Sequence, residues 1–436
     1  MGEQSGGNKP LRIALLGCGT VGLQVARLLI ERAAELAAQI GRDFEIVGVA
    51  VRDLTKPRPG IPADWLTDDA AGLIIRSQPD IVVELIGGLE PAETLIRTAF
   101  ANGAAVVTAN KMLLGDQGQE LFAQAQSAGV DLFFEAAVAG AIPIVRPLRE
   151  SLVGERITEI VGVVNGTTNF IIEQMATKGM AFDAALAQAK QLGYAEEDAS
   201  ADVSGRDAAA KTALLASLGF HTWVNSGQVY REGITALTPE DFQAARTIGC
   251  VIKLLAVATL SADGAVSARV HPALVPADHT LATVSGAYNA IFLESEHAGK
   301  LAFFGPGAGG VPTATAVIGD IVTVGRNRIR GVTTRVQVSE RALPVQGMGQ
   351  VASHYFLRFQ VADAPGILAR VGEVFARHNI SVRSLNQASD ADATGRVQLT
   401  ALTHLVLEAD MQACLAELSH NDFVNGELRM LRVWGL

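Results

Sequence analysis

Residues 193–215, GYAEEDASADVSGRDAAAKTALL, contain the densest group of side chains that could perform acid–base chemistry. Asp207 and Lys211 are spaced i,i+4, so a helix would place both side chains on one face. A loop rich in carboxylates precedes them: Glu196, Glu197, Asp198 and Asp202. In one interpretation the acidic loop captures an ammonium group while Asp207 positions Lys211 as a proton donor. In the other, Ser204 and Asp207 form a capping box and Lys211 is a surface salt-bridge partner.

Two further segments bring charged groups to the ends of expected strands. TANKMLL places Lys111 directly after a strand, at the edge where open α/β sheets bind ligands; the alternative is an ordinary lysine at a helix start. FFEAAVAGAIP places Glu135 before an Ala/Gly loop with many free carbonyl groups. One carboxylate with several carbonyl oxygens can bind a hard cation, and the single negative charge favours a monovalent one. A plain crossover between domains is the alternative.

A glycine-rich turn near the N-terminus, LLGCGTVG, follows the apolar run LRIALL and contains Gly17, Gly19 and Gly22. Glycines at this spacing between a strand and a helix allow a tight turn and close approach to a pyrophosphate group. The next strand ends in VGVAVRD, with Arg52 where the 2′-phosphate of NADP would lie. Asp53 leaves NAD open, because an acidic residue here would hold the ribose hydroxyls, and Arg52 could also be a solvated strand-end residue.

These residues need a scaffold, and the first third of the chain alternates strands with helices as in a doubly wound parallel sheet. Strands are expected at 12–16, 45–51, 81–85, 105–108 and 131–134, and helices at 21–40, 92–102 and 115–128. The sequence therefore predicts an α/β protein with a Rossmann-like dinucleotide-binding domain over residues 11–135, after a disordered leader at 1–10.

The remaining chain predicts an α+β domain for substrate binding and dimerisation over residues 136–309. Its expected strands are 157–164 and parts of 250–260 and 286–296, and its expected helices are 169–175, 182–192, 205–219 and 239–246. FFGPGAGGVPTATAVIGDIV predicts a turn and a helix over 312–325, which returns to the first domain near 310–335. A linker, 336–353, leads to a ferredoxin-like βαββαβ unit at 354–436.

Composition limits the classes of function. The 436 residues carry a net charge of −10 with scattered Lys and Arg, so nucleic acid is not an expected partner. No stretch approaches the ~20 apolar residues of a membrane span, and the N-terminus lacks the pattern of a secretion signal. Cys18, Cys250 and Cys414 show neither disulfide nor metal-ligand spacing. These features together predict a cytoplasmic protein.

Six segments, taken in order, closely resemble homoserine dehydrogenase over about residues 10–335: GCGTVG, ANK, EAAVAGAIP, NGTTNF, GYAEEDASADVSGRDAAAK and GPGAGG. The segment through Asp207 and Lys211 is specific to that family. The tail, with VADAPGILARVGEVFARHNISVRSLNQ, resembles an ACT domain, a small regulatory module that binds amino acids. Ala199 departs from the family pattern, which usually has Pro there. The departure concerns the stiffness of the acidic loop and removes no chemical group.

The resemblance implies a role for each candidate residue. Lys211 would be the proton donor, and Glu196 and Asp207 would bind the amino-acid substrate. Lys111 would lie beside both cofactor and substrate. Cofactor contacts are implied for Gly17, Gly19, Thr20, Val21, Gly22, Arg52, Lys111, Gly193 and Gly309. A cation, Na⁺ or K⁺, would be held by Glu135 and by the carbonyl groups of Val138, Gly140 and Ile142.

The implied reaction is the reversible reduction of L-aspartate 4-semialdehyde to L-homoserine by NADP, with NAD as the alternative, in threonine, methionine and isoleucine biosynthesis. A semialdehyde dehydrogenase that acylates its substrate would need a cysteine nucleophile, and no cysteine lies in a catalytic segment. A non-catalytic amino-acid sensor built on the ACT domain is the alternative from another class.

The tail has its own candidate site. Ile367, Leu368, Val371, Val374 and Phe375 repeat at helical spacing. Gly366, just before them, leaves a free amide that suits an amino-acid carboxylate, and Asn379 opens the next strand. We expect L-threonine to bind here and lower activity, in a homodimer or homotetramer. Because no catalytic segment includes residues 354–436, a chain ending near Arg341 is expected to stay active without responding to threonine.

Overall fold

The computed structural model describes residues 9–334, 342–389 and 395–436. Most of the predicted leader, 1–8, and part of the predicted linker, 335–341, lie outside these described residues. The chain forms two compact units, each assembled from separate segments. The first unit comprises 1–166, 207–229 and 287–343, and the second comprises 167–206, 230–286 and 344–436. Each unit is described below by itself.

The first unit contains the predicted doubly wound parallel sheet. Its six strands lie in the order β3-β2-β1-β4-β5-β6, and every neighbouring pair is parallel. Their bounds are β1 Leu11–Leu16, β2 Phe44–Ala50, β3 Leu66–Thr67, β4 Ile81–Glu84, β5 Ala105–Thr108 and β6 Leu132–Phe133. The order reverses beside β1, so the carboxyl ends of β1 and β4 flank the crevice where such sheets bind ligands.

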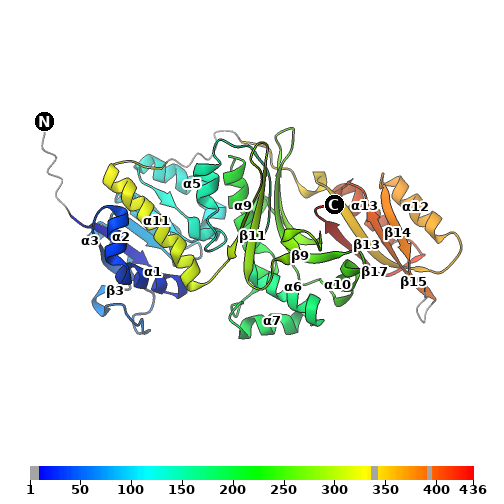
Figure 1. Ribbon diagram of the computed structural model, residues 1–436, viewed down its shortest axis with the longest axis horizontal. Coiled ribbons are helices and arrows are strands. Elements are labelled where there is room, and N and C mark those ends of the chain that lie inside the picture. The colour runs from blue at the N-terminus through cyan, green and yellow to red at the C-terminus, as the bar shows by residue number, and fades with distance from the viewer. Residues whose placement is uncertain (1–8, 335–341, 390–394) are drawn as a thin grey trace. The chain divides into compact units, whose positions relative to one another are not determined.

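Helices cover both faces of this sheet, as the short, continuously apolar strands require. One layer contains α1 (Thr20–Glu31), α2 (Ala33–Ile40) and α11 (Gly310–Arg330), and α11 lies beside α1 (Figure 1). The other layer contains α3 (Ala70–Ser77), α4 (Ala92–Ala101) and α5 (Lys111–Ala128). The helix expected over 21–40 is divided at Arg32, whose backbone leaves the helical conformation. The predicted return of the chain near residues 310–335 is α11.

Three antiparallel strands and one buried helix complete the first unit. The strands are β7 (Ile157–Val163), β11 (Tyr288–Ser295) and β12 (Gly299–Pro306), in the order β12-β11-β7. Almost every residue of α9 (Arg206–Gly219) is buried. α9 packs against α5 through small residues: a Cβ atom on Gly115 would lie in ordinary van der Waals contact with Ala210, at 3.6 Å. This close approach brings the first turns of the two helices together.

The second unit is built mainly on antiparallel strands, and β10 also has two parallel partners, β8 and β17. β9 (Cys250–Leu260) pairs along its full length with β10 (Val266–Pro276), and β10 also pairs in parallel with the short β8 (Tyr230–Arg231). Around them lie α6 (Gly166–Lys178), α7 (Phe182–Gln191), α8 (Ser200–Val203) and α10 (Pro239–Thr247). β10 was not among the expected strands, because Arg269, His271 and Pro272 interrupt its apolar pattern; in the structure all but its last residue are buried.

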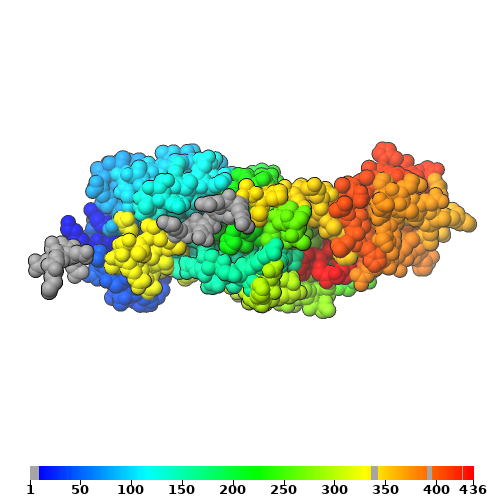
Figure 2. Space-filling view, turned by 90° about the horizontal axis from the view of Figure 1, so that it is seen from above, coloured from blue at the N-terminus to red at the C-terminus, as the bar shows by residue number. Residues whose placement is uncertain are grey.

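The tail has the predicted βαββαβ order, and Figure 2 shows it in orange and red. Its elements are β13 (Ala352–Ala362), α12 (Ile367–Arg377), β14 (Val382–Gln387), β15 (Arg396–Thr403), the two-residue β16 (Val406–Leu407), α13 (Glu408–Ser419) and β17 (Val424–Val433). The main strands lie in the order β17-β13-β15-β14, and Tyr355, Phe359 and Phe375 are among the largest side chains of its core.

The tail is joined to the rest of the second unit by a strand pair. β17 pairs in parallel with β10, and the Trp434 amide donates to the Leu274 carbonyl at 2.9 Å. A chain ending near Arg341 would lack β17 and with it this strand pair. None of the helices in the described ranges combines the length and hydrophobicity needed to span a membrane.

Candidate active site

The glycine turn after β1 has the geometry of a dinucleotide-binding turn. Gly17 has a φ of +101°, and a Cβ atom there would lie 2.6 Å from the Leu85 carbonyl oxygen. A Cβ atom on Gly22 would lie 2.1 Å from the Gly17 carbonyl oxygen, so α1 can approach the turn only with glycine at this position. A Cβ atom on Gly19 would meet no atom within 4 Å, which leaves its backbone and the N-terminus of α1 open to an anion.

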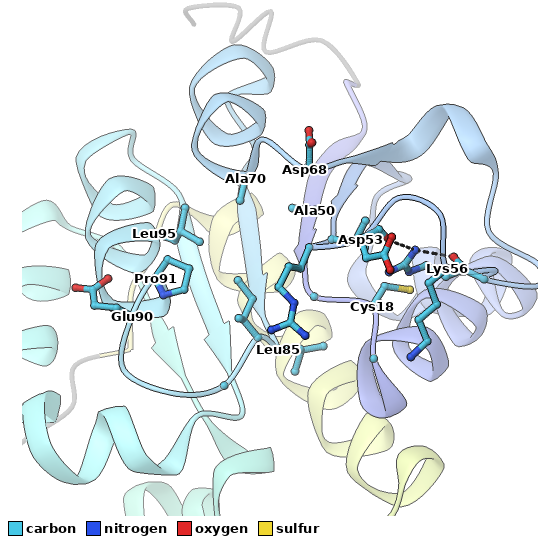
Figure 3. Close-up of a pocket in the computed structure, with 17 residues that line it drawn as sticks. Cys18, Ala50, Asp53, Lys56, Asp68, Ala70, Leu85, Glu90, Pro91 and Leu95 are labelled. Carbon is cyan, nitrogen blue, oxygen red and sulfur yellow. Dashed lines mark hydrogen bonds between the residues drawn. The ribbon is translucent and has the colours of Figure 1, made fainter.

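A cavity of about 720 Å³ opens at this turn, between the ends of β1, β2 and β4 (Figure 3). Its size lies within the range of cofactor pockets. Gly17, Gly19 and the predicted Arg52 line it. Gly309, another predicted cofactor residue, caps α11 nearby, since a Cβ on the next residue, Gly310, would lie 2.9 Å from the Thr20 carbonyl oxygen.

Asp53 also lines the cavity, but its carboxylate is already engaged. The carboxylate accepts hydrogen bonds from the Thr55 amide at 2.9 Å and from the Thr55 hydroxyl at 2.6 Å, and these bonds lower the pKa of Asp53. Arg58 donates to the carbonyl groups of Asp53 and Lys56, as the dashed lines in Figure 3 show. The turn therefore occupies the acidic side chain and leaves Arg52 and Lys56 as cationic groups on the cavity wall.

Two residues that the sequence analysis missed shape this wall. Glu84, fully buried at the end of β4, accepts hydrogen bonds from the amides of Ile86 and Gly87 and from the Thr108 hydroxyl. Asn110 caps α5 and donates to the Gly88 carbonyl at 2.6 Å. Together they hold the loop after β4 against the start of α5. A carboxylate at the end of an otherwise apolar strand, VVEL, was the available signal.

The first turns of α5 and α9 bring three predicted catalytic residues together. The Asp207 carboxylate lies 2.8 Å from the Lys211 ammonium and 3.0 Å from the Lys111 ammonium. Asn165 donates to the same carboxylate at 2.9 Å, and Lys211 donates to the Val164 carbonyl at 2.9 Å. Asp207 and Lys211 are about nine-tenths buried, whereas the Lys111 side chain is 35% exposed. The cluster thus holds two ammonium groups beside one carboxylate.

The charges around Asp207 outweigh the effect of burial on its pKa. Burial alone would raise its pKa, but the attraction of Lys211 and then of Lys111, with hydrogen bonds from Lys211 and Asn165, holds the pKa well below its usual value. Asp207 is therefore a permanent anion that orients two cations.

The structural alternative for this helix is wrong. Ser204 lies after α8 and not at an N-cap of α9, its buried hydroxyl has no hydrogen-bond partner among the described residues, and Lys211 is not on the surface.

The acidic loop belongs to the second unit, where it connects α7 to α8. Glu196 and Glu197 are exposed, and the Asp198 carboxylate accepts a hydrogen bond from the Ser200 amide. Gly193 has a φ of +76° and begins the loop directly after α7. The Thr167 hydroxyl donates to the Tyr194 carbonyl at 2.6 Å, which places the NGTTNF segment against the start of this loop. Two segments named for the resemblance are thus in contact.

The loop predicted to hold a cation has a different arrangement of its carboxylate. Glu135 accepts hydrogen bonds from the amides of residues 144, 145 and 146 at 2.7–2.9 Å. The Asp320 carboxylate accepts hydrogen bonds from the Glu135 amide and from the Arg146 guanidinium. Burial raises the pKa of Asp320 to about 6. The Glu135 carboxylate therefore stabilises the turn at residues 144–146 of its own loop.

The backbone of the same loop is tightly turned. Ala139 and Gly140 have φ values of +55° and +61°, and a Cβ atom on Gly140 would lie 2.6 Å from the Gly307 carbonyl oxygen. Gly307 in turn covers Asn289, whose fully buried amide nitrogen and oxygen have no hydrogen-bond partner among the described residues. An orphaned buried amide beside a carbonyl-rich turn fits a water molecule or a weakly charged ion.

Known proteins match this chain over the glycine turn, the acidic loop, the Asp207–Lys211 helix and the tail. The homoserine dehydrogenase family model matches residues 143–322, the model of its NAD-binding domain matches 17–135, and the ACT model matches 355–413. A homoserine dehydrogenase of Mycobacterium tuberculosis is 46% identical over 437 residues, covering 99% of both chains. A crystal structure of a homoserine dehydrogenase from Thiobacillus denitrificans has a TM-score of 0.92 and 39% identity, covering 98% of each chain.

A hyperthermophilic archaeal homoserine dehydrogenase in complex with NADPH has a TM-score of 0.62 and 27% identity, covering 72% of this chain and 98% of its own. The matches include the catalytic segments as well as the ACT domain, which favours the enzyme over the sensor. The chain belongs to the homoserine dehydrogenase family, whose members are NAD(P)-dependent oxidoreductases acting on a CH–OH group.

Proposed function

We propose that Lys211 is the proton donor in the reduction of L-aspartate 4-semialdehyde to L-homoserine. The observation that carries this proposal is the Lys111–Asp207–Lys211 cluster, in which a permanently charged carboxylate holds both ammonium groups within 3.0 Å. A bound nicotinamide cofactor would supply the hydride. As the aldehyde oxygen gains negative charge, Lys211 would stabilise it and transfer a proton to it, which typically contributes ~10²–10⁴-fold to the rate.

We assign separate tasks to the other members of the cluster. Asp207 cannot compete for the proton because its pKa is so low, and it orients Lys211 toward the substrate. Lys111 is more exposed and would contact cofactor and substrate. In the second unit, Glu196 would bind the substrate ammonium group, which its exposed carboxylate on the acidic loop supports. Asp207 would contribute to the same binding.

We propose NADP as the preferred cofactor. Arg52 lines the cavity at the end of β2, and the Thr55 amide and hydroxyl hold one oxygen of the neighbouring Asp53 carboxylate, which weakens it as a partner for the ribose hydroxyls of NAD. The archaeal relative in complex with NADPH supports the same choice. The contacts would come from the Gly17–Gly22 turn, including Gly19, Thr20 and Val21, and from Lys111, Gly193 and Gly309.

A monovalent cation, Na⁺ or K⁺, would fit the loop after Glu135 if backbone oxygens held it. Val138, Gly140 and Ile142 would offer their carbonyl groups, and the buried Asn289 amide supports an unassigned polar occupant close by. Glu135 would act by fastening the loop. A ligand set of low charge suits a monovalent ion better than a divalent one.

We also propose feedback inhibition by L-threonine through the ACT domain, in a homo-oligomer. The structure supports an open site at the start of α12, where Gly366 has a φ of +88° and a Cβ atom on it would meet nothing within 4 Å. Steady-state rates with NADPH and with NADH, each with and without threonine, test the proposed cofactor and effector together. A higher kcat/KM with NADH, or rates indifferent to threonine, would contradict the corresponding proposal.

A further inference from the structure

A buried arginine of the tail lies at the centre of a charged cluster in the second unit. The Arg432 side chain is only 3% exposed, and its guanidinium binds the Glu408 carboxylate through two hydrogen bonds, of 2.9 and 2.5 Å. The Tyr355 hydroxyl donates to Glu408 at 2.7 Å. Within the tail, therefore, Glu408 already neutralises Arg432 by a bidentate pair.

The same guanidinium also reaches out of the tail to β8. Its third nitrogen donates to the Glu232 carboxylate at 2.7 Å, and the nitrogen shared with Glu408 lies 3.2 Å from the Tyr230 hydroxyl. Tyr230 begins β8 and Glu232 directly follows it, and β10 holds both, since β8 pairs with β10 and the Glu232 amide donates to the Val270 carbonyl at 2.8 Å. Arg432 thus joins β17 to β8 through a side chain, in addition to the backbone pairing of β17 with β10.

The two residues after Glu232 touch the end of α8. The Ile234 amide donates to the Val203 carbonyl at 2.9 Å, and a Cβ atom on Gly233 would lie 2.3 Å from the same oxygen. At Gly205, which has a φ of +77°, a Cβ atom would lie in ordinary van der Waals contact with the Glu232 carbonyl oxygen, at 3.5 Å. A side chain at residue 233 would clash with the Val203 carbonyl, so the Glu232–Ile234 segment packs directly on the last residue of α8.

The position of this connection matters for the proposed site. α8 follows the acidic loop directly, and Gly205 stands two residues before Asp207 in the chain. Burial of an ion pair seldom stabilises a fold more than apolar residues would, because desolvation offsets the attraction. A buried arginine that binds one carboxylate in the tail and another on β8 is better explained by positioning.

We propose that Arg432 is a positioning residue for the acidic loop: it holds Glu232, and the segment Glu232–Ile234 holds the end of α8. The ACT domain thereby sets the geometry of the substrate-binding loop, and a shift of β17 or of Glu408 at the start of α13 reaches that loop through Arg432. This inference rests on the proposed role of Glu196 in binding substrate.

The test variant is Glu232→Gln in the full chain. The Glu232 side chain is 40% exposed and Arg432 keeps Glu408, so folding should be preserved. We expect the KM for aspartate semialdehyde to rise about threefold to tenfold, with kcat and the KM for NADPH nearly unchanged. Hydrogen exchange of the peptides containing Ile234 and residues 194–204 should become faster.

The matched control is Asp422→Asn, which removes an exposed carboxylate from Arg370 of α12, an ion pair that lies entirely within the tail. The control should change neither the KM for aspartate semialdehyde nor the hydrogen exchange.

Arg432→Lys keeps the positive charge but loses the forked geometry of the guanidinium group. As a single variant it should raise the KM for aspartate semialdehyde. Combined with Glu232→Gln it should raise the KM little further, because both changes break the same contact.

An unchanged KM and unchanged exchange in Glu232→Gln, or equal changes in the control, would overturn the proposal. Glu196→Gln separates this failure from failure of the proposed function. If Glu196→Gln raises the KM and Glu232→Gln does not, the acidic loop binds substrate and the coupling is wrong. If neither variant changes the KM but the exchange of residues 194–204 increases, the coupling holds and the assignment of Glu196 fails.

Discussion

Substitution of Lys211 by Met removes the proposed proton donor while keeping most of its volume. Asp207 retains Lys111 at 3.0 Å and Asn165 at 2.9 Å, so its buried charge keeps two partners. We therefore expect a stability loss of about 1–3 kcal/mol, which leaves the protein folded. The Val164 carbonyl loses its donor, and this loss contributes to the cost.

The effect on turnover should be far larger than the effect on stability. Loss of a general acid should lower kcat by about 10²–10⁴-fold, equivalent to about 3–5 kcal/mol of transition-state stabilisation. The dissociation constant of NADPH, measured by fluorescence titration, should stay close to that of the wild type. Oxidation of NADPH with aspartate semialdehyde, followed by absorbance, measures kcat, and thermal unfolding measures the stability in parallel.

Two further variants make the result decisive. Lys190→Met is a matched control, because its ammonium group lies 3.8 Å from Glu197, the side chain of which is 99% exposed, and it should keep kcat. Lys111→Met removes the other ammonium group that contacts Asp207 and should mainly raise KM values. If Lys211→Met keeps kcat within about fivefold of the wild type, Lys211 is structural. If Lys111→Met loses more turnover than Lys211→Met, Lys111 is the donor.

Four other predictions concern cofactor, ion and pH. Arg52→Ala should raise the KM for NADPH about tenfold with little effect on NADH, and equal changes for both would show that Arg52 contacts no phosphate. Thr55→Val should remove the shorter of the two hydrogen bonds to the Asp53 carboxylate and lower the KM for NADH relative to NADPH; an unchanged ratio contradicts the role given to the turn. Rates should depend on Na⁺ or K⁺, and Glu135→Ala should weaken this dependence; a wild type indifferent to both ions has no such site. Burial lowers the pKa of Lys253 to about 8 in the folded state, against about 10.4 unfolded, so the unfolded chain binds more protons between these values and stability rises with pH there. Lys253→Met should flatten that rise in chemical unfolding curves from pH 8 to 10, and a parallel curve would refute the shift.

Local sequence determined the elements and the nucleotide turn. Short apolar strands alternating with amphipathic helices predict a doubly wound sheet because only helices on both faces can bury such strands. The roles of Gly17 and Gly22 follow from spacing, since strand, turn and helix are contiguous in the chain. The same holds for the βαββαβ order of the tail, where apolar periodicity in α12 and the strands is regular.

Contacts between distant segments were decided by tertiary structure. Lys111 and Asp207 are 96 positions apart, and they meet because α5 packs against α9, where Gly115 lies beside Ala210. The spacing of Asp207 and Lys211 left two interpretations open, and only the fold shows that Lys211 is buried and not a surface salt-bridge partner. β10 was not predicted because Arg269 and His271 are residue types that are usually exposed, and only the neighbouring strands of the fold bury them.

The direction in which a side chain points depends on donors that the local sequence does not reveal. The Glu135 carboxylate, expected to help hold a cation, also accepts hydrogen bonds from three backbone amides of the next turn. The Asp53 carboxylate accepts two hydrogen bonds from Thr55. Nothing in the local sequence indicated a role for Arg432, because its partners Glu232 and Glu408 lie in distant segments of the chain. Sequence thus determines which groups are available, and packing decides their partners, because a buried charge takes the donors and acceptors that the fold brings within hydrogen-bond distance.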